Sequence, residues 1–154
     1  IYETKLLRDK LLIQEKDEKT VTKKSLSVVT KKKPTTKQLD DMLFAFKIAR
    51  YVKSNSIVFV KNNKTLAIGA GQMSRIDSTN LAFNKSKKER ISLKGSVMAS
   101  EAFFPFRDNV DLAKKIGVSA IIQPGGSLND DKIIDVADKH KLAMCFSHTR
   151  VFKH

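Results

Sequence analysis

The chain has 154 residues, of which 41% are hydrophobic, and a formal net charge of +14. This length suits one domain or part of a larger one, and the apolar fraction can support a buried core. The first residues, among them Glu3, Lys5 and Arg8, lack the apolar stretch of a secretory signal, and no run reaches the length of a membrane span. The single cysteine, Cys145, cannot form an internal disulfide, which favours a reducing, cytoplasmic setting.

The positive charge lies mostly before residue 101, largely in lysine runs such as Lys31–Lys33 and Lys85–Arg90. It indicates either a nucleic-acid-binding surface or a solvated lysine-rich surface around a site for small anions. The basic runs contain no aromatic residue that could stack on bases, and no helix-turn-helix, zinc-finger or RNA-recognition signature occurs. These absences favour the second interpretation, and a basic α/β module that binds nucleic acid stays as the alternative.

The start of the chain predicts short strands at residues 10–14 and 26–30, of the edge or connecting kind. A basic linker, Lys31–Thr36, follows. The first residue of the chain is Ile1 rather than Met, and the opening residues read like the middle of a longer protein. We therefore expect an upstream part that this sequence does not include.

The next segment predicts a helix. Thr35 and Gln38 have the spacing of a capping box, in which each side chain bonds the backbone of the other. The helix is expected to run to about Lys53, with Asn55 as a left-handed cap. Its apolar residues recur at helical spacing and predict a core-facing stripe: Leu39, Met42, Leu43, Phe46 and Ala49.

Residues 56–60 and 65–70 predict two strands joined by a tight turn at Asn62-Asn63. The continuous apolar character of 65–70 predicts a central strand. The run 68–75 (IGAGQMSR) then has the order strand, glycine turn, helix start. One interpretation of this junction is a binding site for an anionic group at the helix N-terminus. The alternative is that the glycines serve only to let the helix pack closely on the strand. Arg75, in the first turn, opposes the helix dipole, and a residue that breaks a local rule hints at a ligand.

Residues 84–94 predict a lysine-rich mobile connection. The segment 95–111 (GSVMASEAFFPFRDNVD) is typical of neither a strand nor a helix. Its apolar residues do not alternate as in a strand, and a helix would not carry Pro105 at its centre. It indicates the wall of a binding pocket or a buried loop that plugs a core. Asp108 is the expected N-cap of a helix that ends at Ile116, with Gly117 as its stop.

The pattern then repeats. Residues 118–123 predict a buried strand, 124–127 (PGGS) a glycine turn, and Ser127 or Asn129 the cap of a helix that ends near His140. Residues 142–146 predict a further strand of the same kind. This alternation is typical of an α/β layer whose ligands bind beyond the carboxyl ends of the strands. Arg150, directly after a strand, is placed for an anion contact or for a surface salt bridge.

Several kinds of chemistry are absent. The three histidines and one cysteine have no metal-ligand spacing, so a zinc deaminase is excluded, and no Gly-x-Ser-x-Gly elbow occurs. Cys145 lies in an apolar strand and is expected to be inert packing. The residues alone therefore predict an α/β scaffold that binds a small anionic substrate and lacks a complete catalytic set.

Five ordered motifs show a resemblance to a known family: KSNS at 53–56, IGAGQMSR at 68–75, GSVMASEAFFPFRD at 95–108, IIQPGGS at 121–127 and HTRVFKH at 148–154. Over essentially its whole length the chain resembles the bifunctional AICAR transformylase/IMP cyclohydrolase family of purine biosynthesis. The resemblance implies that residues 37–154 form the C-terminal half of the transformylase domain. Residues 1–36 would be connecting strands and a linker from the upstream part, and the cyclohydrolase domain lies wholly upstream.

The implied fold is a cytidine-deaminase-like three-layer α/β half-domain, with a mixed sheet, helices on both faces and no zinc. The implied reaction transfers a formyl group from 10-formyltetrahydrofolate, a co-substrate, to the amine of AICAR, without a metal. The implied partners are AICAR, a reduced folate, the missing N-terminal part and a second copy in a cytoplasmic homodimer. Neither nucleic acid nor a membrane is implied.

The resemblance also assigns site residues, each by its motif. Phe104 and Phe106 are expected to anchor the wall between the two substrates. The family's Lys-His pair for proton transfer comes from the upstream half, and Lys139-His140 does not match its context, so the isolated chain is expected to be inactive. The implied residues are Asn55 for catalysis, Arg75, Phe103 and Arg150 for AICAR, and Ser74, Pro105 and Asp108 for folate.

Overall fold

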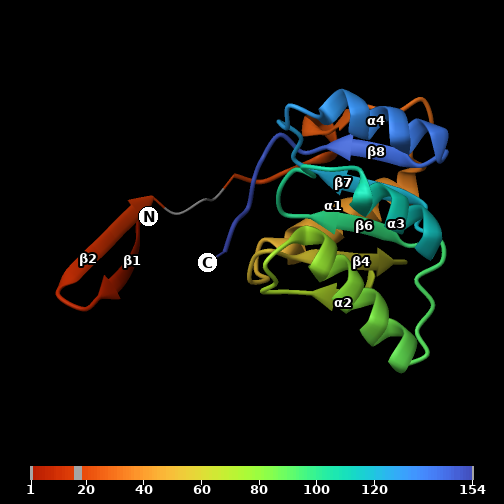
Figure 1. Ribbon diagram of the computed structural model, residues 1–154. Coiled ribbons are helices and arrows are strands. Elements are labelled where there is room, and N and C mark those ends of the chain that lie inside the picture. The colour runs from red at the N-terminus through yellow and green to blue at the C-terminus, as the bar shows by residue number, and fades with distance from the viewer. Residues whose placement is uncertain (1, 16–18, 154) are drawn as a thin grey trace.

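The computed structural model describes residues 2–15 and 19–153 (Figure 1). A short 3-10 helix at Lys23–Ser25 precedes the main body. The other elements, in chain order, are β1 (Tyr2–Leu7), β2 (Lys10–Glu15), β3 (Ser27–Val28), α1 (Thr36–Ala49), β4 (Ile57–Lys61), β5 (Lys64–Gly69), α2 (Arg75–Lys88), β6 (Val97–Ser100), α3 (Asp108–Ile116), β7 (Ala120–Gln123), α4 (Asp130–Lys139) and β8 (Ala143–Phe146).

The main body is built on a six-stranded mixed sheet with the strand order β3-β8-β7-β6-β4-β5. β6, β7 and β8 are parallel, β4 is antiparallel to both of its neighbours, and β3 is antiparallel to β8. Because β4 is antiparallel to both β5 and β6, those two strands run in the same direction. The strands β5, β6, β7 and β8 therefore all end on the same side of the sheet. We call this side the carboxyl edge; it carries the strand ends Gly69, Ser100, Gln123 and Phe146.

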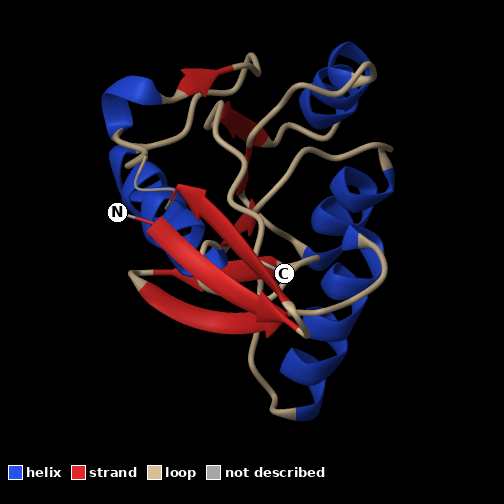
Figure 2. Cartoon of the chain, turned by 90° about the vertical axis from the view of Figure 1, so that its left-hand side faces the viewer, coloured by secondary structure: helices blue, strands red, loops and turns tan. Residues whose placement is uncertain are grey.

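Each face of the sheet packs on its own core, as the period of two along a strand requires. On β4, Ile57 and Phe59 join the core beneath α2, α3 and α4, whereas Val58 and Val60 join the core beneath α1. Figure 2 shows helices on both sides of the strands. The expected fold class, a mixed sheet with helices on both faces, is confirmed.

The capping box at the start of α1 forms as predicted. Thr35 Oγ1 accepts from the Gln38 N–H at 3.2 Å, and Gln38 Oε1 accepts from the Thr35 N–H at 2.8 Å. The helix ends earlier than expected, at Ala49, with Arg50 as a right-handed cap. The prediction of Asn55 as a left-handed cap is therefore wrong. α3 does end at Ile116, where Gly117 takes φ = +87°.

Three predicted elements differ from the structure. β5 is the edge strand and not a central one: among the described strands it pairs with β4 alone, and the side chains of residues 65–68 are therefore only half-buried. α2 extends to Lys88, so the first part of the expected connection 84–94 is helical. The central strand β6 lies inside the segment that predicted no strand, since its short run of small residues between serines hides the apolar alternation.

The hairpin β1–β2 forms a sheet of its own (Figure 1). β2 was expected as a strand; its partner β1 was not. Every residue of both strands is exposed, including Tyr2, Leu6, Leu11 and Ile13. A two-stranded hairpin is only marginally stable by itself, so this apolar surface calls for a partner.

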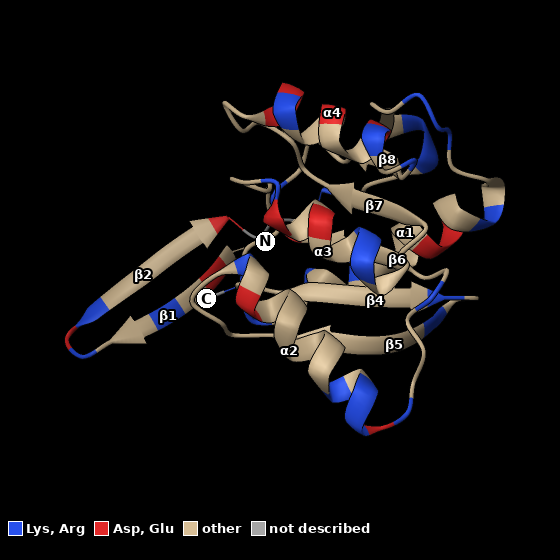
Figure 3. Cartoon of the chain, turned by 45° about the vertical axis from the view of Figure 1, so that its right-hand side comes forward, with Lys and Arg blue, Asp and Glu red and all other residues tan. Residues whose placement is uncertain are grey.

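Two groups of lysines lie at helix ends remote from the carboxyl edge. Figure 3 shows blue residues at the far ends of α2 and α3, where their last turns carry Lys85, Lys87, Lys88, Lys114 and Lys115. Cations at a helix C-terminus complement the helix dipole. In the part of the chain that is described, no helix combines the length and the apolar character needed to cross a bilayer.

We expect Asp41→Asn to lower the free energy of unfolding by about 1–3 kcal/mol, the cost of unpairing buried polar groups. Both carboxylate oxygens of this buried α1 residue accept backbone N–H groups, from Asn62 at 3.0 Å and from Asn63 at 2.6 Å, and so tie the β4–β5 turn to α1. Urea unfolding measures the loss. The neighbouring Asp40→Asn is the control: its side chain is half-exposed and pairs with Lys23, so it should change stability by about 0.5 kcal/mol or less. Equal losses in the two variants would contradict this role for Asp41.

We expect Asp111→Asn to cost stability in a pH-dependent way. Arg107 donates to Asp111 at 2.7 Å and 3.1 Å and lowers the pKa of this carboxyl to about 2; His140 of the adjoining helix end lies at 2.7 Å. Because the folded-state pKa lies below the unfolded one, the contribution is present above about pH 4 and is lost as the pH falls toward 2. Both partners are exposed, so the effect stays below about 1 kcal/mol.

The difference in urea midpoint between wild type and Asp111→Asn should therefore shrink between about pH 6 and about pH 2.5. The exposed α4 acid Asp135, changed to Asn, provides the comparison and should show no such narrowing. A difference for Asp111→Asn that stays constant across this range would show that the carboxylate charge does not matter.

Candidate functional site at the carboxyl edge

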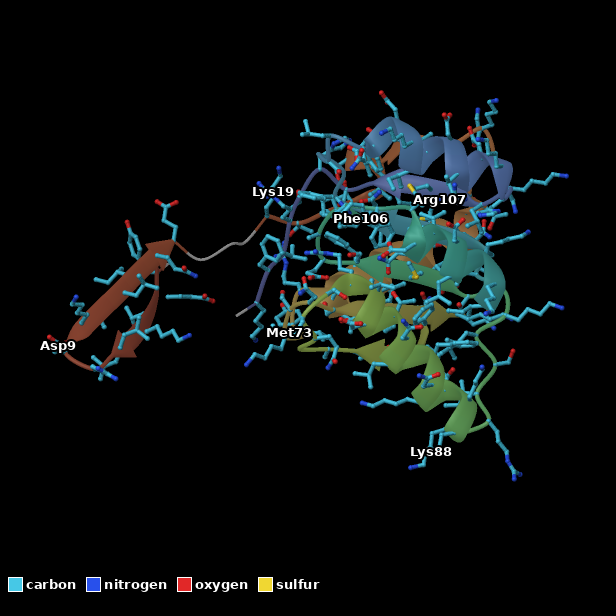
Figure 4. The ribbon with its side chains drawn as sticks, viewed as in Figure 1. Asp9, Lys19, Met73, Lys88, Phe106 and Arg107 are labelled. Atoms are coloured by element: carbon cyan, nitrogen blue, oxygen red, sulfur yellow. The ribbon has the colours of Figure 1, made fainter. Side chains whose placement is uncertain are left out.

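All seven residues implied by the resemblance lie in segments at the carboxyl edge. Ser74 and Arg75 follow β5, the loop 103–108 follows β6, Arg150 follows β8, and Asn55 precedes β4, whose start lies at the same edge. Figure 4 labels Met73 and Phe106 from two of these loops, on the side toward which β8 points in Figure 1. The topology thus brings together residues that are up to 95 positions apart in the chain.

The glycine turn after β5 serves packing first. A Cβ at Gly69 would lie 1.8 Å from the Ser78 carbonyl oxygen, so only glycine allows α2 to approach the strand this closely. Ser74 is the N-cap of α2: its Oγ accepts from the Asp77 N–H at 3.2 Å and lies 2.6 Å from Asp77 Oδ2. Ser74 therefore sets where the helix begins.

Arg75 forms a buried ion pair that sequence reasoning missed. Its Nη2 donates to Glu101 Oε1 at 3.4 Å, and Glu101, directly after β6, is fully buried. Ser56 Oγ donates to the other oxygen, Oε2, at 3.3 Å. Burial raises the pKa of Glu101, while the nearby Arg75 charge lowers it; burial also lowers the pKa of Arg75. The available signal was an acid inside the otherwise uncharged run MASEAFF.

Asn55 is half-buried and bridges two segments of the site. Its side-chain Nδ2 donates to the backbone carbonyl oxygen of Gln72 at 2.9 Å, and its backbone carbonyl oxygen accepts from Ser78 Oγ at 2.7 Å. These bonds hold the chain before β4 against the glycine turn and α2. An amide nitrogen has two N–H groups, so the side chain keeps donor capacity beyond the bond to Gln72.

The loop after β6 is anchored by Phe104. This side chain is fully buried, and its N–H donates to Gln123 Oε1 at 2.9 Å. Phe103 and Pro105 are half-buried, and the Pro105 carbonyl oxygen accepts from Asn129 Nδ2 at 3.0 Å. Phe106 is 64% exposed and lines a cavity beside Pro105, so it is not anchored in the core as Phe104 is; its place in the wall between the two substrates stays a prediction.

Asp108 begins α3 as its first helical residue, and Arg107 occupies the N-cap position. The expected cap role is therefore wrong by one residue. Asp108 Oδ1 accepts from the backbone N–H and the Nδ2 of Asn109, at 2.7 Å and 3.2 Å. Asn109 Oδ1 in turn accepts from Thr79 Oγ1 at 2.7 Å, which joins α3 to α2 within the core.

Arg150 is exposed and lines a cavity of about 210 Å³ with Pro124, Gly125, Gly126 and His148. Gly125 has φ = +72°, and a Cβ there would lie 2.5 Å from the Phe146 ring, so the turn has room only for glycine. The N–H of Gly126 donates to Asp130 Oδ2 at 2.6 Å. The cavity is the right size for a small anionic group beside a guanidinium.

Pro105 lines a different cavity, of about 500 Å³, between the start of α3 and α4. It shares no lining residue with the cavity at Arg150. The edge therefore gathers the implied residues without enclosing them in one pocket. Among residues 2–15 and 19–153, no cluster of three His, Cys, Asp or Glu side chains could hold a metal ion.

The chain was compared with known proteins. The family model "AICARFT/IMPCHase bienzyme" matches residues 2–85. The bifunctional purine biosynthesis protein PurH of Chlorobium phaeobacteroides (strain DSM 266 / SMG 266 / 2430) is 51% identical over 144 residues, which cover 94% of this chain and 28% of that protein. The PurH proteins of Chlorobaculum parvum (52% over 144 residues; 94% and 28%) and Xanthomonas axonopodis pv. citri (48% over 153 residues; 99% and 29%) are similar.

Among solved structures, apo dCMP deaminase from the cyanophage S-TIM5 aligns with a TM-score of 0.49 and 17% sequence identity, over 65% of this chain and 91% of that one. The chain spans less than a third of the length of the curated relatives named above. The family model covers more than half of the chain, and the identity to these relatives is near one half over almost all of it. The chain belongs to the AICARFT/IMPCHase bienzyme family.

Proposed function

We propose that this chain is the C-terminal half of an AICAR transformylase domain, acting in purine biosynthesis. In the complete protein it takes part in the transfer of a formyl group from 10-formyltetrahydrofolate to the 5-amino group of AICAR. The observation that carries the proposal is the convergence of the family's site motifs, from four separate segments, at one edge of the sheet. On this proposal residues 1–36 connect the half-domain to an upstream part that also contains the IMP cyclohydrolase.

The nucleotide end of AICAR is assigned to Arg150. Its guanidinium can bind two phosphate oxygens at once, and the adjoining glycine turn leaves space for the group. Phe103 is assigned to the carboxamide through its backbone, which the buried Phe104 beside it holds in place. Arg75 is assigned to AICAR from the start of α2, where its guanidinium pairs with Glu101.

The folate is assigned to Ser74, Pro105 and Asp108. Asp108 uses one carboxylate oxygen for Asn109, so the other is available to accept from a pterin N–H. Pro105 borders the cavity between α3 and α4, which has the volume of a small-molecule site. Ser74 is also the N-cap of α2, so we assign it to lining the folate site and not to a hydrogen bond with the folate.

The chemistry asks the protein mainly for positioning. The amine of AICAR is a weak nucleophile because its electrons delocalise toward the carboxamide. Holding the carboxamide weakens this delocalisation and directs the amine to the formyl carbon. A tetrahedral intermediate then places negative charge on the formyl oxygen, which a preorganised donor stabilises. Asn55 is our candidate, through the amide N–H that does not bond Gln72.

The proposal needs further protein surface. The cavities at Pro105 and Arg150 are separate, and the hairpin β1–β2 exposes a row of apolar side chains. We propose that the upstream part of the same protein and a second copy in a cytoplasmic homodimer cover these surfaces. The upstream part would also supply the Lys-His pair for proton transfer. The isolated chain should then bind its substrates weakly and not turn over.

Formyl transfer tests the proposal directly. The full-length protein that contains this chain, supplied with AICAR and 10-formyltetrahydrofolate, should release tetrahydrofolate and form formylated AICAR, which its cyclohydrolase then closes to IMP, whereas the 154-residue chain should form neither product. Absence of product with the full-length protein would reject the function. Binding of random duplex DNA that weakens steeply with salt would instead support the nucleic-acid alternative.

Asn55→Ala should lower kcat of the full-length protein about 10²-fold, the scale for losing one oxyanion donor. Asn80→Ala, an exposed change on α2, is the control and should leave kcat unchanged. Steady-state formyl transfer measures both. A kcat for Asn55→Ala within a few-fold of wild type would remove Asn55 from the catalytic step.

A further inference from the structure

The ion pair of Arg75 with Glu101 is unusual in its burial. The Arg75 side chain is 15% exposed and that of Glu101 is 0% exposed. Taking two charges out of water costs more than their attraction returns unless geometry and further hydrogen bonds are favourable. Here the Nη2–Oε1 distance is 3.4 Å, which is long for a charged pair. A pair this buried and this loose is poorly explained by stability alone.

The position of Arg75 is also electrostatically unfavourable for α2. It is the first residue of α2, where backbone N–H groups favour negative charge. Its Nε–H is buried and has no acceptor among the described residues. Glu101 satisfies one nitrogen of the guanidinium, and the remaining donors call for an oxygen from outside this part of the chain. The Phe152 ring, 5.8 Å from Arg75 Cζ, covers the guanidinium from the tail.

Glu101 is held from several directions at once. Its Oε2 accepts from Ser56 Oγ, at the start of β4, and its backbone carbonyl oxygen accepts from the Val151 N–H at 3.0 Å. The carboxylate thus occupies the junction of β4, β6, the tail and α2, between Arg75 and Arg150's segment. A flexible arginine whose one nitrogen bonds a rigid carboxylate loses most of its freedom before any ligand arrives.

We propose that Glu101 is a positioning residue: with Ser56 it holds the Arg75 guanidinium so that its remaining N–H groups face an oxygen of the anionic substrate at the carboxyl edge. This rests on the proposed function, because the substrate is the one assigned there. Glu101 touches no substrate and acts through Arg75. The role accounts for the buried charge, for the cation at a helix start and for the unpartnered Nε–H together.

The test is a double-mutant cycle in the full-length protein. Glu101→Gln keeps the shape and removes the charge, and it should lower kcat/KM about 10²-fold, the loss expected when a substrate-holding group shifts by about 1 Å. Arg75→Ala should lower it at least as far. Because both changes break one unit, the double variant should be no worse than Arg75→Ala.

Chemical rescue separates positioning from structure. Arg75→Ala leaves a gap lined by Glu101, and added guanidinium can occupy it. We expect guanidinium to restore several-fold of kcat/KM in Arg75→Ala and nothing in Arg75→Ala/Glu101→Gln, since the carboxylate is needed to hold the ion. A purely structural role of Glu101 would leave this rescue intact once both proteins are folded.

Asp41→Asn is the matched control, because it is also a buried acid changed to its amide, at the opposite edge of the sheet, where it accepts from Asn62 and Asn63. It should lower stability without changing kcat/KM or its response to guanidinium. If Glu101→Gln does not fold, Ser56→Ala takes its place: it keeps both charges, loosens the carboxylate and should lower kcat/KM several-fold, non-additively with Arg75→Ala.

The outcomes are distinguishable. A wild-type protein without formyl transfer would overturn the proposed function and this inference with it. An active wild type in which the losses of Glu101→Gln and Arg75→Ala multiply, or in which guanidinium rescues with and without Glu101, would overturn the positioning role and leave the function standing.

Discussion

Parallel strands need crossovers, and this requirement shapes the whole molecule. β6, β7 and β8 run in the same direction, so the chain must return across the sheet through a helix before each new strand. The returning helices α3 and α4 cover one face together with α2, and α1 covers the other. As a result, the loops that leave the strands open at one edge, and whatever side chains they carry are brought together there.

That edge holds polar groups at a depth where apolar side chains are normal. Glu101, Ser56 and Asn109 are all buried, and each is bonded to a neighbour from a different element. The bonds connect β4, β6, α2 and α3 directly behind the surface loops. A buried polar network of this kind is costly unless nearly every member is satisfied, and it then favours a single arrangement. Arg75 Nε, which has no acceptor among the described residues, is where we expect the missing ligand or protein surface to act.

Sequence patterns predicted the local elements well where the signal was local. The Thr35–Gln38 box, the Gly117 stop and the Asn62-Asn63 turn all formed at the expected residues, because each depends on bonds within a few positions. The two asparagines take φ = 56° and 54°, as a tight hairpin turn requires. Helix ends were predicted less well. α1 ends four residues before the expected Lys53, and the N-cap of α3 lies one residue before the expected Asp108.

Patterns failed where position in the sheet mattered. The apolar residues of β5 predicted a central strand, yet none of the described strands flanks its outer side. β6 is central although it has only four residues and ends in a serine, because burial on both faces comes from its neighbours and not from its own composition. Glu101 was missed for the same reason: its partner Arg75 is 26 residues away.

The sequence by itself determined the Thr35–Gln38 capping box, the Gly117 stop, the strand–turn–helix units and, through its ordered motifs, the family. These follow from short-range bonds and from residue identity. Only the tertiary structure decided that β6 stands at the centre, that Phe106 is exposed while Phe104 is buried, and that Arg75 is held by Glu101 and Ser56. The physical reason is that register and crossovers set which distant residues meet, and no local pattern contains that information.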